Sequence, residues 1–482
     1  METQPCNVLP HVILLSFPAQ GHISPLLRLG KIFASKGMMV TLTAPNKDGI
    51  AEKIRISDKT ISSEEPTSYG DGKIRFEFFA DEAQGITVPE QYMENLERIG
   101  KRKLTEMIRE SAEQGRPVCC LIYSCFIPWV ADLGESLGIP SAPLWVQSAA
   151  SFSAYYHYHH KLVPFPTESE PELDVQLPCM PVLKPYEIPS FLHPQSQFPA
   201  LTDSILSIFK NLNKNCCVLM ESFQELESEV INYMSKLCPI KPIGPLFLYS
   251  TNIASTSSAN VSVNGYITDD CKEWLDSKPA NSVVYVSFGS GDGVKPEQGD
   301  ELAYGLLNSG VSFLWVIRPP KSDLLPKGFL EKAGEKGKIV QWSNQKQVLD
   351  HPSVACFLTH CGWNSTMETL SSGVPVLCFP IMGEQVTDAK YLVDEFRVGL
   401  RLSRGDFDKT IITRDEIEKC LREATAGPKA AELKQNAMKY KKAAEDAVAE
   451  GGSSHLTLLE FLDELKVEVP GEVKSTAKEN TV

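Results

Sequence analysis

One segment of the chain combines apolar runs with a helical pattern in an order that few folds accommodate. It comprises residues 11–45, HVILLSFPAQGHISPLLRLGKIFASKGMMVTLTAP. The apolar run 12–16 predicts a buried strand, and apolar side chains between 25 and 33 recur at the spacing of one helix face. A second apolar run follows a glycine. A strand, a helix and a second strand in this order form a βαβ unit, which gives a parallel sheet with ligand sites at the carboxyl ends of its strands.

The same pattern recurs along the chain. Residues 118–146 repeat the order of strand, loop, helix and strand. A further set begins at SVVYVSFGS (282–290), continues with a helix at 296–309 and a strand at 311–319, and extends through the apolar runs of GKIVQW, VACFLTH and PVLCFP. We therefore predict an α/β protein of two Rossmann-like domains, whose parallel sheets face each other across a cleft.

The two sets of elements are separated by PIGPLFLYSTNIASTSSANVSVNGYITDD, which is rich in Ser, Asn, Gly and Pro. That composition is typical of a linker, and a chain of 482 residues is too long for one hydrophobic core. The predicted divisions are a first domain at 1–245, a linker at 246–275, a second domain at 276–453, and a closing helix with a charged, disordered tail at 454–482.

Composition excludes several classes of partner. The formal net charge is −14, whereas nucleic acids and anionic membranes require a basic face. The thirteen cysteines are scattered without a C-x-x-C motif, which favours reduced thiols in a reducing compartment. The N-terminus lacks the order of a signal peptide, and VILLSF is too short to span a bilayer. We expect a cytoplasmic protein with no integral membrane segment and no nucleic-acid partner.

The stretch FLTHCGWNSTMETL, residues 357–370, begins as a strand and continues as a helix. Its strand delivers His360 to the carboxyl edge of the second sheet, and Gly362 lets the backbone turn closely. The free N–H groups at the following helix start are suited to an anion. Asn364 and Ser365 could add donors without adding charge. On this stretch alone, helix capping and a core tryptophan explain the residues somewhat better than a bound anion does.

A longer segment decides between these interpretations. Residues 342–385 read WSNQKQVLDHPSVACFLTHCGWNSTMETLSSGVPVLCFPIMGEQ. This closely resembles the nucleotide-sugar signature box of plant family-1 glycosyltransferases, in its 44-residue length and in its order W…Q…HxGWNS…E…GVP…P…(D/E)Q. The resemblance continues through SFPAQGHISPLLRLG, VVYVSFGS and EGGSSHLTLLEFLDEL. It implies a GT-B fold, a UDP-sugar donor, inversion at the anomeric carbon, and neither a metal nor another cofactor.

The resemblance also implies roles for the nucleoside and sugar ends of the box. Trp342 would stack on uracil, since an aromatic face suits a flat ring. Gln345 and Glu368 would bind the ribose hydroxyls. Glu384 and Gln385 would hold the hexose, and a glutamine at the last position favours glucose as the transferred sugar.

The diphosphate would lie at the helix start between these two ends. The resemblance implies that Ser290, His360, Asn364 and Ser365 hold it, with Trp363 in the same turn. The helix end would then stabilise the leaving UDP, so that no cation is required.

His22, in the loop after the first strand, matches the family's catalytic base. We expect a neutral imidazole near its ordinary pKa of roughly 6.5. Most relatives have an aspartate that orients this histidine, but here the stretch IYSCFIPW places Ser124 at that position. Serine cannot balance the charge of an imidazolium. A carboxylic acid, with a pKa of about 4, arrives already ionised, so the substitution favours an acidic acceptor.

The segment 162–194 resembles most the branch that makes glucose esters of hydroxycinnamic and hydroxybenzoic acids. Two departures leave alternatives open. Gly291, Asp292 and Gly293 replace bulkier apolar residues, and Met382 replaces an aromatic side chain; either change is compatible with a C-glucosyltransferase or with neutral drift.

We therefore predict an inverting UDP-glucose-dependent glucosyltransferase that forms 1-O-glucose esters of small phenolic acids. The alternatives are a C- or O-glucosyltransferase of polyphenols and a UDP-sugar-binding protein with degraded catalysis. The histidine-rich stretch YYHYHHK (155–161) has no acidic neighbour, and we expect it to line the acceptor pocket or a helix surface rather than to bind zinc. We expect a monomer.

Overall fold

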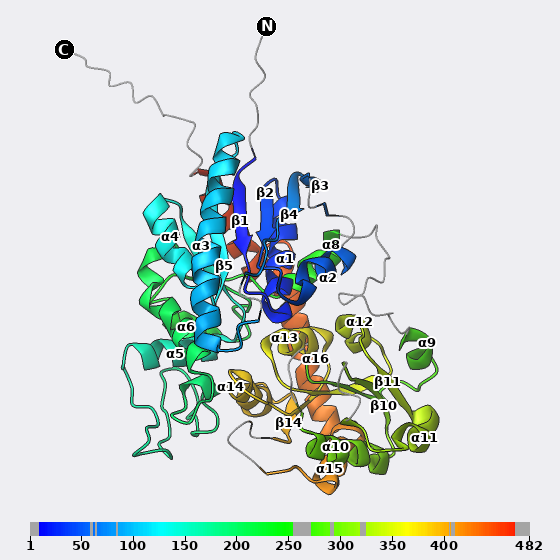
Figure 1. Cartoon of the computed structure of the whole chain (residues 1–482). Helices are drawn as coiled ribbons and strands as arrows, with labels where there is room; N and C mark the ends of the chain where they lie inside the picture. Colours follow the sequence, from blue (N-terminus) through cyan, green and yellow to red (C-terminus); the bar gives the residue numbers. More distant parts are fainter. Residues whose placement is uncertain are drawn as a thin grey trace, which may run out of the picture.

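The computed structural model describes residues 9–57, 61–62, 65–82, 85–253, 271–289, 294–318, 324–403, 405 and 410–467. The chain forms two α/β halves, one above the other in Figure 1, each built on its own sheet. Every strand pairing except one is parallel. The predicted α/β fold with two parallel-sheet domains is confirmed.

The first half contains an eight-stranded sheet in the order β3-β4-β2-β1-β5-β6-β7-β8, in which only β3 and β4 pair antiparallel. Its strands are β1 (His11–Leu15), β2 (Met39–Thr43), β3 (Thr67–Tyr69), β4 (Gly72–Phe76), β5 (Val118–Ser124), β6 (Ser141–Trp145), β7 (Val218–Met220) and β8 (Ile240–Pro242). Its helices are α1 (Gln20–Ser35), α2 (Ile50–Ser57), α3 (Pro89–Glu113), α4 (Trp129–Leu137), α5 (Ala149–His159), α6 (Pro199–Lys210), α7 (Ser228–Met234) and α8 (Leu246–Ile253).

The second half contains a six-stranded sheet in the order β11-β10-β9-β12-β13-β14. Its strands are β9 (Val283–Ser287), β10 (Ser312–Val316), β11 (Gly337–Val340), β12 (Val354–Thr359), β13 (Val376–Cys378) and β14 (Gly399–Arg401). The helices of this part of the chain are α9 (Cys271–Asp276), α10 (Pro296–Ser309), α11 (Phe329–Ala333), α12 (Gln345–Leu349), α13 (Trp363–Ser372), α14 (Gln385–Lys390), α15 (Arg414–Ala426) and α16 (Ala430–Val448).

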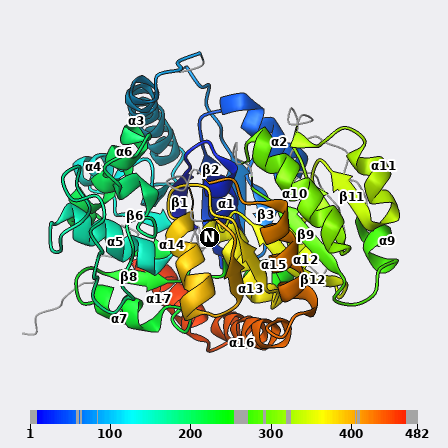
Figure 2. The same ribbon diagram turned by 90° about the horizontal axis from the view of Figure 1, so that it is seen from below.

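The last described helix, α17 (Ser453–Val467), returns to the first half and packs against β8. Figure 2 shows α16 along the lower edge of the view and α17 beside β8 and α7. The helix predicted at 454–465 is therefore present. Most of the predicted linker, residues 254–270, lies outside the described residues, and the predicted domain divisions remain predictions.

The central strands are buried on both faces because helices cover both sides of each sheet. All five residues of β1 and of β9 are buried, as their apolar sequences require. In the first sheet the order reverses at β1, which lies between β2 and β5. In the second it reverses at β9, which lies between β10 and β12. Such reversals open a crevice at the carboxyl ends of the strands, where ligands bind in folds of this kind.

Candidate active site

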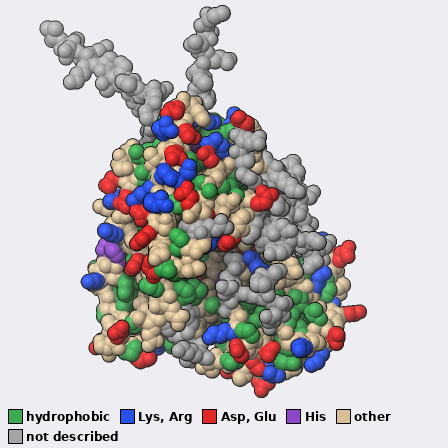
Figure 3. Space-filling view, in the orientation of Figure 1, with side chains coloured by type: hydrophobic (Ala, Val, Ile, Leu, Met, Phe, Trp, Pro, Cys, Tyr) green, Lys and Arg blue, Asp and Glu red, His purple; other side chains and the backbone are tan. Residues whose placement is uncertain are grey.

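A cavity of about 530 Å³ lies between the two halves, where the carboxyl ends of both sheets face each other. Figure 3 shows the surface hollowed at this level. Ten of the residues predicted from the sequence line it: His22, Trp342, Gln345, His360, Trp363, Asn364, Ser365, Glu368, Glu384 and Gln385. Ser290 and the segment 291–293 lie outside the described residues.

His22 lies at the start of α1, on the first-half wall of the cavity. Its Nδ1 atom is 2.7 Å from Ser124 Oγ, at the end of the neighbouring strand β5. The rings of Phe17 and Phe126 contact the imidazole edge-to-face, with centroids 5.6 and 5.0 Å away. Two aromatic rings and a hydroxyl surround this histidine, and within the described part of the chain no carboxylate contacts it.

Burial in these surroundings lowers the pKa of His22 to about 4. The pKa is therefore well below the value of roughly 6.5 expected from the sequence, because neither water nor a nearby anion stabilises the imidazolium. His22 is neutral at physiological pH. It is also a weaker base than an aspartate-paired histidine would be.

His360 follows β12 and faces the cavity from the second half. Its ring is enclosed by two glycines: a Cβ on Gly289 or on Gly362 would come within 2.6 Å of Nε2. Burial, together with the charge of Arg318, lowers the pKa of His360 to about 4. The Nδ1 atom is buried and has no hydrogen-bond partner among the described residues, so it is available to a ligand oxygen.

The start of α13 connects the two halves through Asn364. Pro25 lies inside α1 and has no N–H. The carbonyl of Gly21, one turn earlier, therefore has no donor within the helix. The Asn364 amide donates to that carbonyl across the cleft, at 2.9 Å. Its Oδ1 atom is buried without a partner in the described structure. Asn364 therefore places one unsatisfied polar atom at the helix start.

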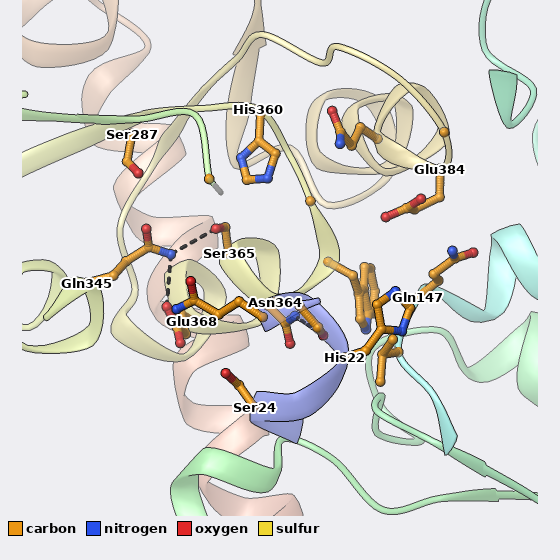
Figure 4. Close-up of a pocket in the computed structure, with 18 of the residues that line it drawn as sticks. His22, Ser24, Gln147, Ser287, Gln345, His360, Asn364, Ser365, Glu368 and Glu384 are labelled. Atoms are coloured by element: carbon orange, nitrogen blue, oxygen red, sulfur yellow. Dashed lines mark hydrogen bonds between the residues drawn. The ribbon is translucent and has the colours of Figure 1, made fainter. Parts of the chain in front are cut away.

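One turn further along, a hydrogen-bonded group lies at the expected nucleoside end of the cavity (Figure 4). The Gln345 amide donates to Ser365 Oγ at 2.8 Å and to Glu368 Oε2 at 2.9 Å. Arg28 of α1 forms an ion pair with Glu368 at 3.0 Å. Arg28 was not predicted from the sequence, because only the fold shows that its side of α1 faces α13.

At the opposite end, Glu384 lines the cavity and is partly buried, and Asp388 of α14 is fully buried. Burial raises the pKa of Glu384 to about 7 and that of Asp388 well above its usual range. Ser148, at the start of α5, donates to Asp388 Oδ1 at 2.8 Å. The Gln385 side-chain oxygen accepts from the backbone N–H groups of Ile381 and Met382, which fixes its amide at the wall.

Trp363 differs from the other predicted residues. Its side chain is buried, and its indole N–H donates to the backbone carbonyl of Glu221, in the first half, at 2.5 Å. The polar atom of this residue is thus occupied by the other half of the chain. Trp363 therefore packs between the two halves of the chain, whereas a direct contact between Trp363 and the donor remains a prediction.

Gln147 is a cavity residue that sequence reasoning missed. It follows β6, is 3% exposed, and lies between His22 and Glu384 in Figure 4. Its Oε1 atom is buried without a hydrogen-bond partner in the part of the chain that the structure describes. Nothing in the string LWVQSAAS marks it, since its importance comes from the adjacency of β5 and β6.

The histidine-rich stretch 155–161 forms the end of α5 and the following turn. His157 stacks on Tyr233, with ring centroids 5.8 Å apart. Within the described ranges no group of three or more His, Cys, Asp or Glu side chains is placed to hold a metal ion. Among the helices described, none combines the length and the apolar character needed to cross a bilayer.

Known proteins with similar sequences show the family to which the chain belongs. The family model described as UDP-glucoronosyl and UDP-glucosyl transferase matches residues 196–450. A gallate 1-beta-glucosyltransferase of Punica granatum is 58% identical over 471 residues, which cover 95% of this chain and 89% of that protein. A cinnamate beta-D-glucosyltransferase of Fragaria ananassa is 55% identical, covering 95% and 83% respectively. The chain belongs to the UDP-glucosyltransferase family.

Solved structures of the same kind share the fold. A complex of Os79 from O. sativa with UDP superposes with a TM-score of 0.81 at 30% identity, covering 94% of this chain and all of that one. UGT2 of Phytolacca americana, complexed with UDP-2fluoro-glucose and pterostilbene, gives a TM-score of 0.77 at 25% identity, covering 96% and 100%. The GT-B fold expected from the signature box is therefore confirmed.

Proposed function

We propose that this enzyme transfers glucose from UDP-glucose to the carboxylate of small phenolic acids, giving 1-O-β-glucose esters. The observation that carries the proposal is the partly buried pair of His22 and Ser124, in which no acid among the described residues supports a protonated imidazole. The relatives named above act on gallate and cinnamate, which are aromatic carboxylic acids. Acceptors of this kind need no strong base.

The donor would lie across the second half of the cavity. Trp342 would stack on uracil, and the group of Gln345 and Glu368 would accept and donate hydrogen bonds at the ribose. The unpartnered Nδ1 of His360 and the N–H groups at the start of α13 suit the diphosphate. Ser365 would contribute a hydroxyl there.

The sugar would extend toward the remaining end of the cavity. Glu384 and Gln385 would hold the glucose hydroxyls, which directs the anomeric carbon toward His22. UDP-glucose is the donor substrate in this proposal, and polar side chains together with the start of α13 would bind it.

The chemical step is a single displacement. An oxygen of the acceptor carboxylate attacks C1 of glucose, while the bond from C1 to the β-phosphate oxygen breaks and its electron pair leaves with UDP. No proton is transferred, because the acceptor enters as an anion. Developing charge on UDP is stabilised by the start of α13 and by His360, which lowers the barrier relative to the ground state.

The test is incubation of the purified enzyme with UDP-glucose and a panel in which each phenolic acid is paired with the corresponding phenol lacking the carboxyl. Mass spectrometry would identify the glucosides, and mild alkali would distinguish esters, which hydrolyse, from phenolic O-glucosides and C-glucosides, which do not. We expect alkali-labile products from the acids. Alkali-stable products alone would overturn the proposal and favour a polyphenol glucosyltransferase.

A further inference from the structure

The hydroxyl of Ser124 has one polar side-chain neighbour. Ser124 is 2% exposed, and its Oγ atom contacts His22 Nδ1 at 2.7 Å. Among the described residues the structure gives this hydroxyl no second side-chain partner. The thiol of Cys125, 4.0 Å from the same Nδ1, is another group that carries a proton.

This arrangement decides where the imidazole proton is. If Nδ1 carried the proton and donated to Ser124, the serine proton would be left in a buried site with no acceptor, which costs free energy. If Ser124 donates to Nδ1, both groups are satisfied and the imidazole proton is on Nε2. An aspartate at position 124 would enforce the opposite tautomer, because a carboxylate can only accept.

The neutral tautomer set by Ser124 has a chemical consequence. Nδ1 is turned to Ser124, so Nε2 is the nitrogen that His22 offers to the cavity, and there it presents an N–H donor. A hydroxyl acceptor would need a base at this point, and an N–H cannot remove its proton. A carboxylate, which only accepts hydrogen bonds, fits the donor.

Gln147 supplies a second donor on the same wall. Its side chain is nine-tenths or more buried, has no hydrogen-bond partner in the described structure, and lies beside His22 (Figure 4). An amide buried in this way is costly unless a ligand completes its hydrogen bonds. The atom left without a partner is the amide oxygen, which a carboxylate cannot satisfy. A half-turn about the last side-chain bond exchanges this oxygen with the N–H₂ group, which then offers donors that a carboxylate can accept.

We propose that Gln147 and the Nε2–H of His22 together bind the acceptor carboxylate, and that Ser124 is the positioning residue that sets the tautomer. This inference rests on the proposed function. In the displacement described above, His22 keeps its proton throughout. One carboxylate lone pair forms the bond to C1, and the leaving electron pair goes to UDP.

The first experiment measures binding of a phenolic acid to the enzyme saturated with UDP, a complex in which no transfer occurs. Gln147→Leu should weaken this binding by about ten- to hundredfold, the scale of a lost hydrogen bond to a charged group. Binding of the matched neutral phenol, and of UDP itself, should change less than about twofold. The control is Gln435→Leu, at an exposed position of α16, which should leave all three constants unchanged.

Equal losses for the acid and the phenol would overturn the inference, since they would show that Gln147 acts by packing alone. An unchanged affinity for the acid would overturn it as well. The product assay separates this failure from failure of the proposed function: a wild-type enzyme that makes no ester contradicts the function, whereas an ester-forming enzyme that is insensitive to Gln147→Leu contradicts only the inference.

The second experiment reads the tautomer directly. In protein labelled with ¹⁵N-histidine, the two nitrogens of a neutral imidazole have well-separated shifts, and the His22 signals are assigned by their loss in His22→Gln. We expect the wild type to carry its proton on Nε2 and Ser124→Asp to carry it on Nδ1. A proton on Nδ1 in the wild type would contradict the role given to Ser124, and retained UDP binding confirms that each variant is folded.

Discussion

Ser124 affects how easily His22 can be protonated, and so it bears on which acceptors the enzyme can use. Forming an imidazolium at His22 is unfavourable because burial already lowers its pKa to about 4 and the hydroxyl beside it carries no charge. A reaction that needs no imidazolium is unaffected by this cost. On the proposed function, Ser124 would therefore select acceptors by their acidity rather than by their shape.

We predict that Ser124→Asp reverses this selection. The new carboxylate would help His22 accept a proton, so kcat/KM for a weakly acidic phenol should rise by about ten- to hundredfold. For a phenolic acid it should fall, because two like charges about 4 Å apart repel by about 4 kcal/mol at an effective dielectric of 20, before screening. The ratio of the two kcat/KM values in wild type and variant is the quantity to measure.

A variant that gains equally on both acceptors would contradict the acidic-acceptor argument. Ser124→Ala is the matched control. It removes the hydrogen bond that sets the tautomer without adding charge, so it should lower turnover of the acid but should not raise kcat/KM for the phenol as far as Ser124→Asp does.

We also predict that glucose recognition depends on pH through Glu384. Its pKa is raised to about 7 by burial, so the side chain is a neutral acid at pH 6 and a carboxylate at pH 8. A carboxylate accepts stronger hydrogen bonds from sugar hydroxyls. The affinity for UDP-glucose relative to UDP should therefore rise by about tenfold between pH 6 and 8 in calorimetric titrations. Glu384→Gln should abolish this rise; a rise of the same size in the variant would assign it to another group.

At the scale of elements, the turns after β9 and β12 shape the phosphate end of the cavity. Both bring a glycine against the ring of His360, and each leaves no room for a Cβ. The two glycines differ in backbone conformation. Gly289 has a φ of +74°, whereas Gly362 has a φ of −59°, which any residue adopts.

Because only Gly289 has a positive φ, alanine variants of the two glycines distinguish the effect of crowding His360 from the effect of backbone strain. Gly362→Ala and Gly289→Ala should each displace the His360 ring and weaken UDP binding by about tenfold or more, as measured by calorimetry. Gly115→Ala is the matched control, because Gly115 has a φ of +72° but nothing within 4 Å of an added Cβ. It should share the strain of Gly289→Ala while leaving UDP affinity unchanged. Normal affinity in Gly362→Ala would contradict the confinement of His360.

The same elements show what could be predicted from sequence. The strand at 282–290 and the helix at 296–309 were found as β9 and α10, because buried parallel strands are continuous apolar runs and a proline marks the helix start. The indole bond of Trp363 could not be predicted, because its acceptor lies 142 residues earlier in the chain. Gln147 and Arg28 were missed for the same reason: their roles follow from which strands and helices become neighbours.

For the whole molecule, the important feature is that the chain returns to its first half. After α16 the chain continues into α17. Two glutamates of this helix, Glu460 and Glu464, form ion pairs with Lys241 of β8, at 3.3 and 3.0 Å. Phe461 packs against Phe33 of α1, with ring centroids 6.1 Å apart. Since α1 carries His22 at its other end, the C-terminal helix supports the element that positions the proposed acceptor site.

We predict that Phe461→Ala destabilises the protein far more than a surface change on the same helix. Phe461 is 1% exposed, and truncating a buried phenylalanine typically costs about 3–5 kcal/mol in the free energy of unfolding, from lost burial and the cavity left behind. Leu456→Ala, at a position 55% exposed, should change it by less than about 0.5 kcal/mol. Urea denaturation followed by tryptophan fluorescence gives both values.

If α17 supports the first half as its contacts with β8 and α1 indicate, Phe461→Ala should also reduce turnover at sub-denaturing urea while UDP affinity, which depends on the second half, persists. Equal midpoints for the two variants would show that α17 covers the first half without stabilising it.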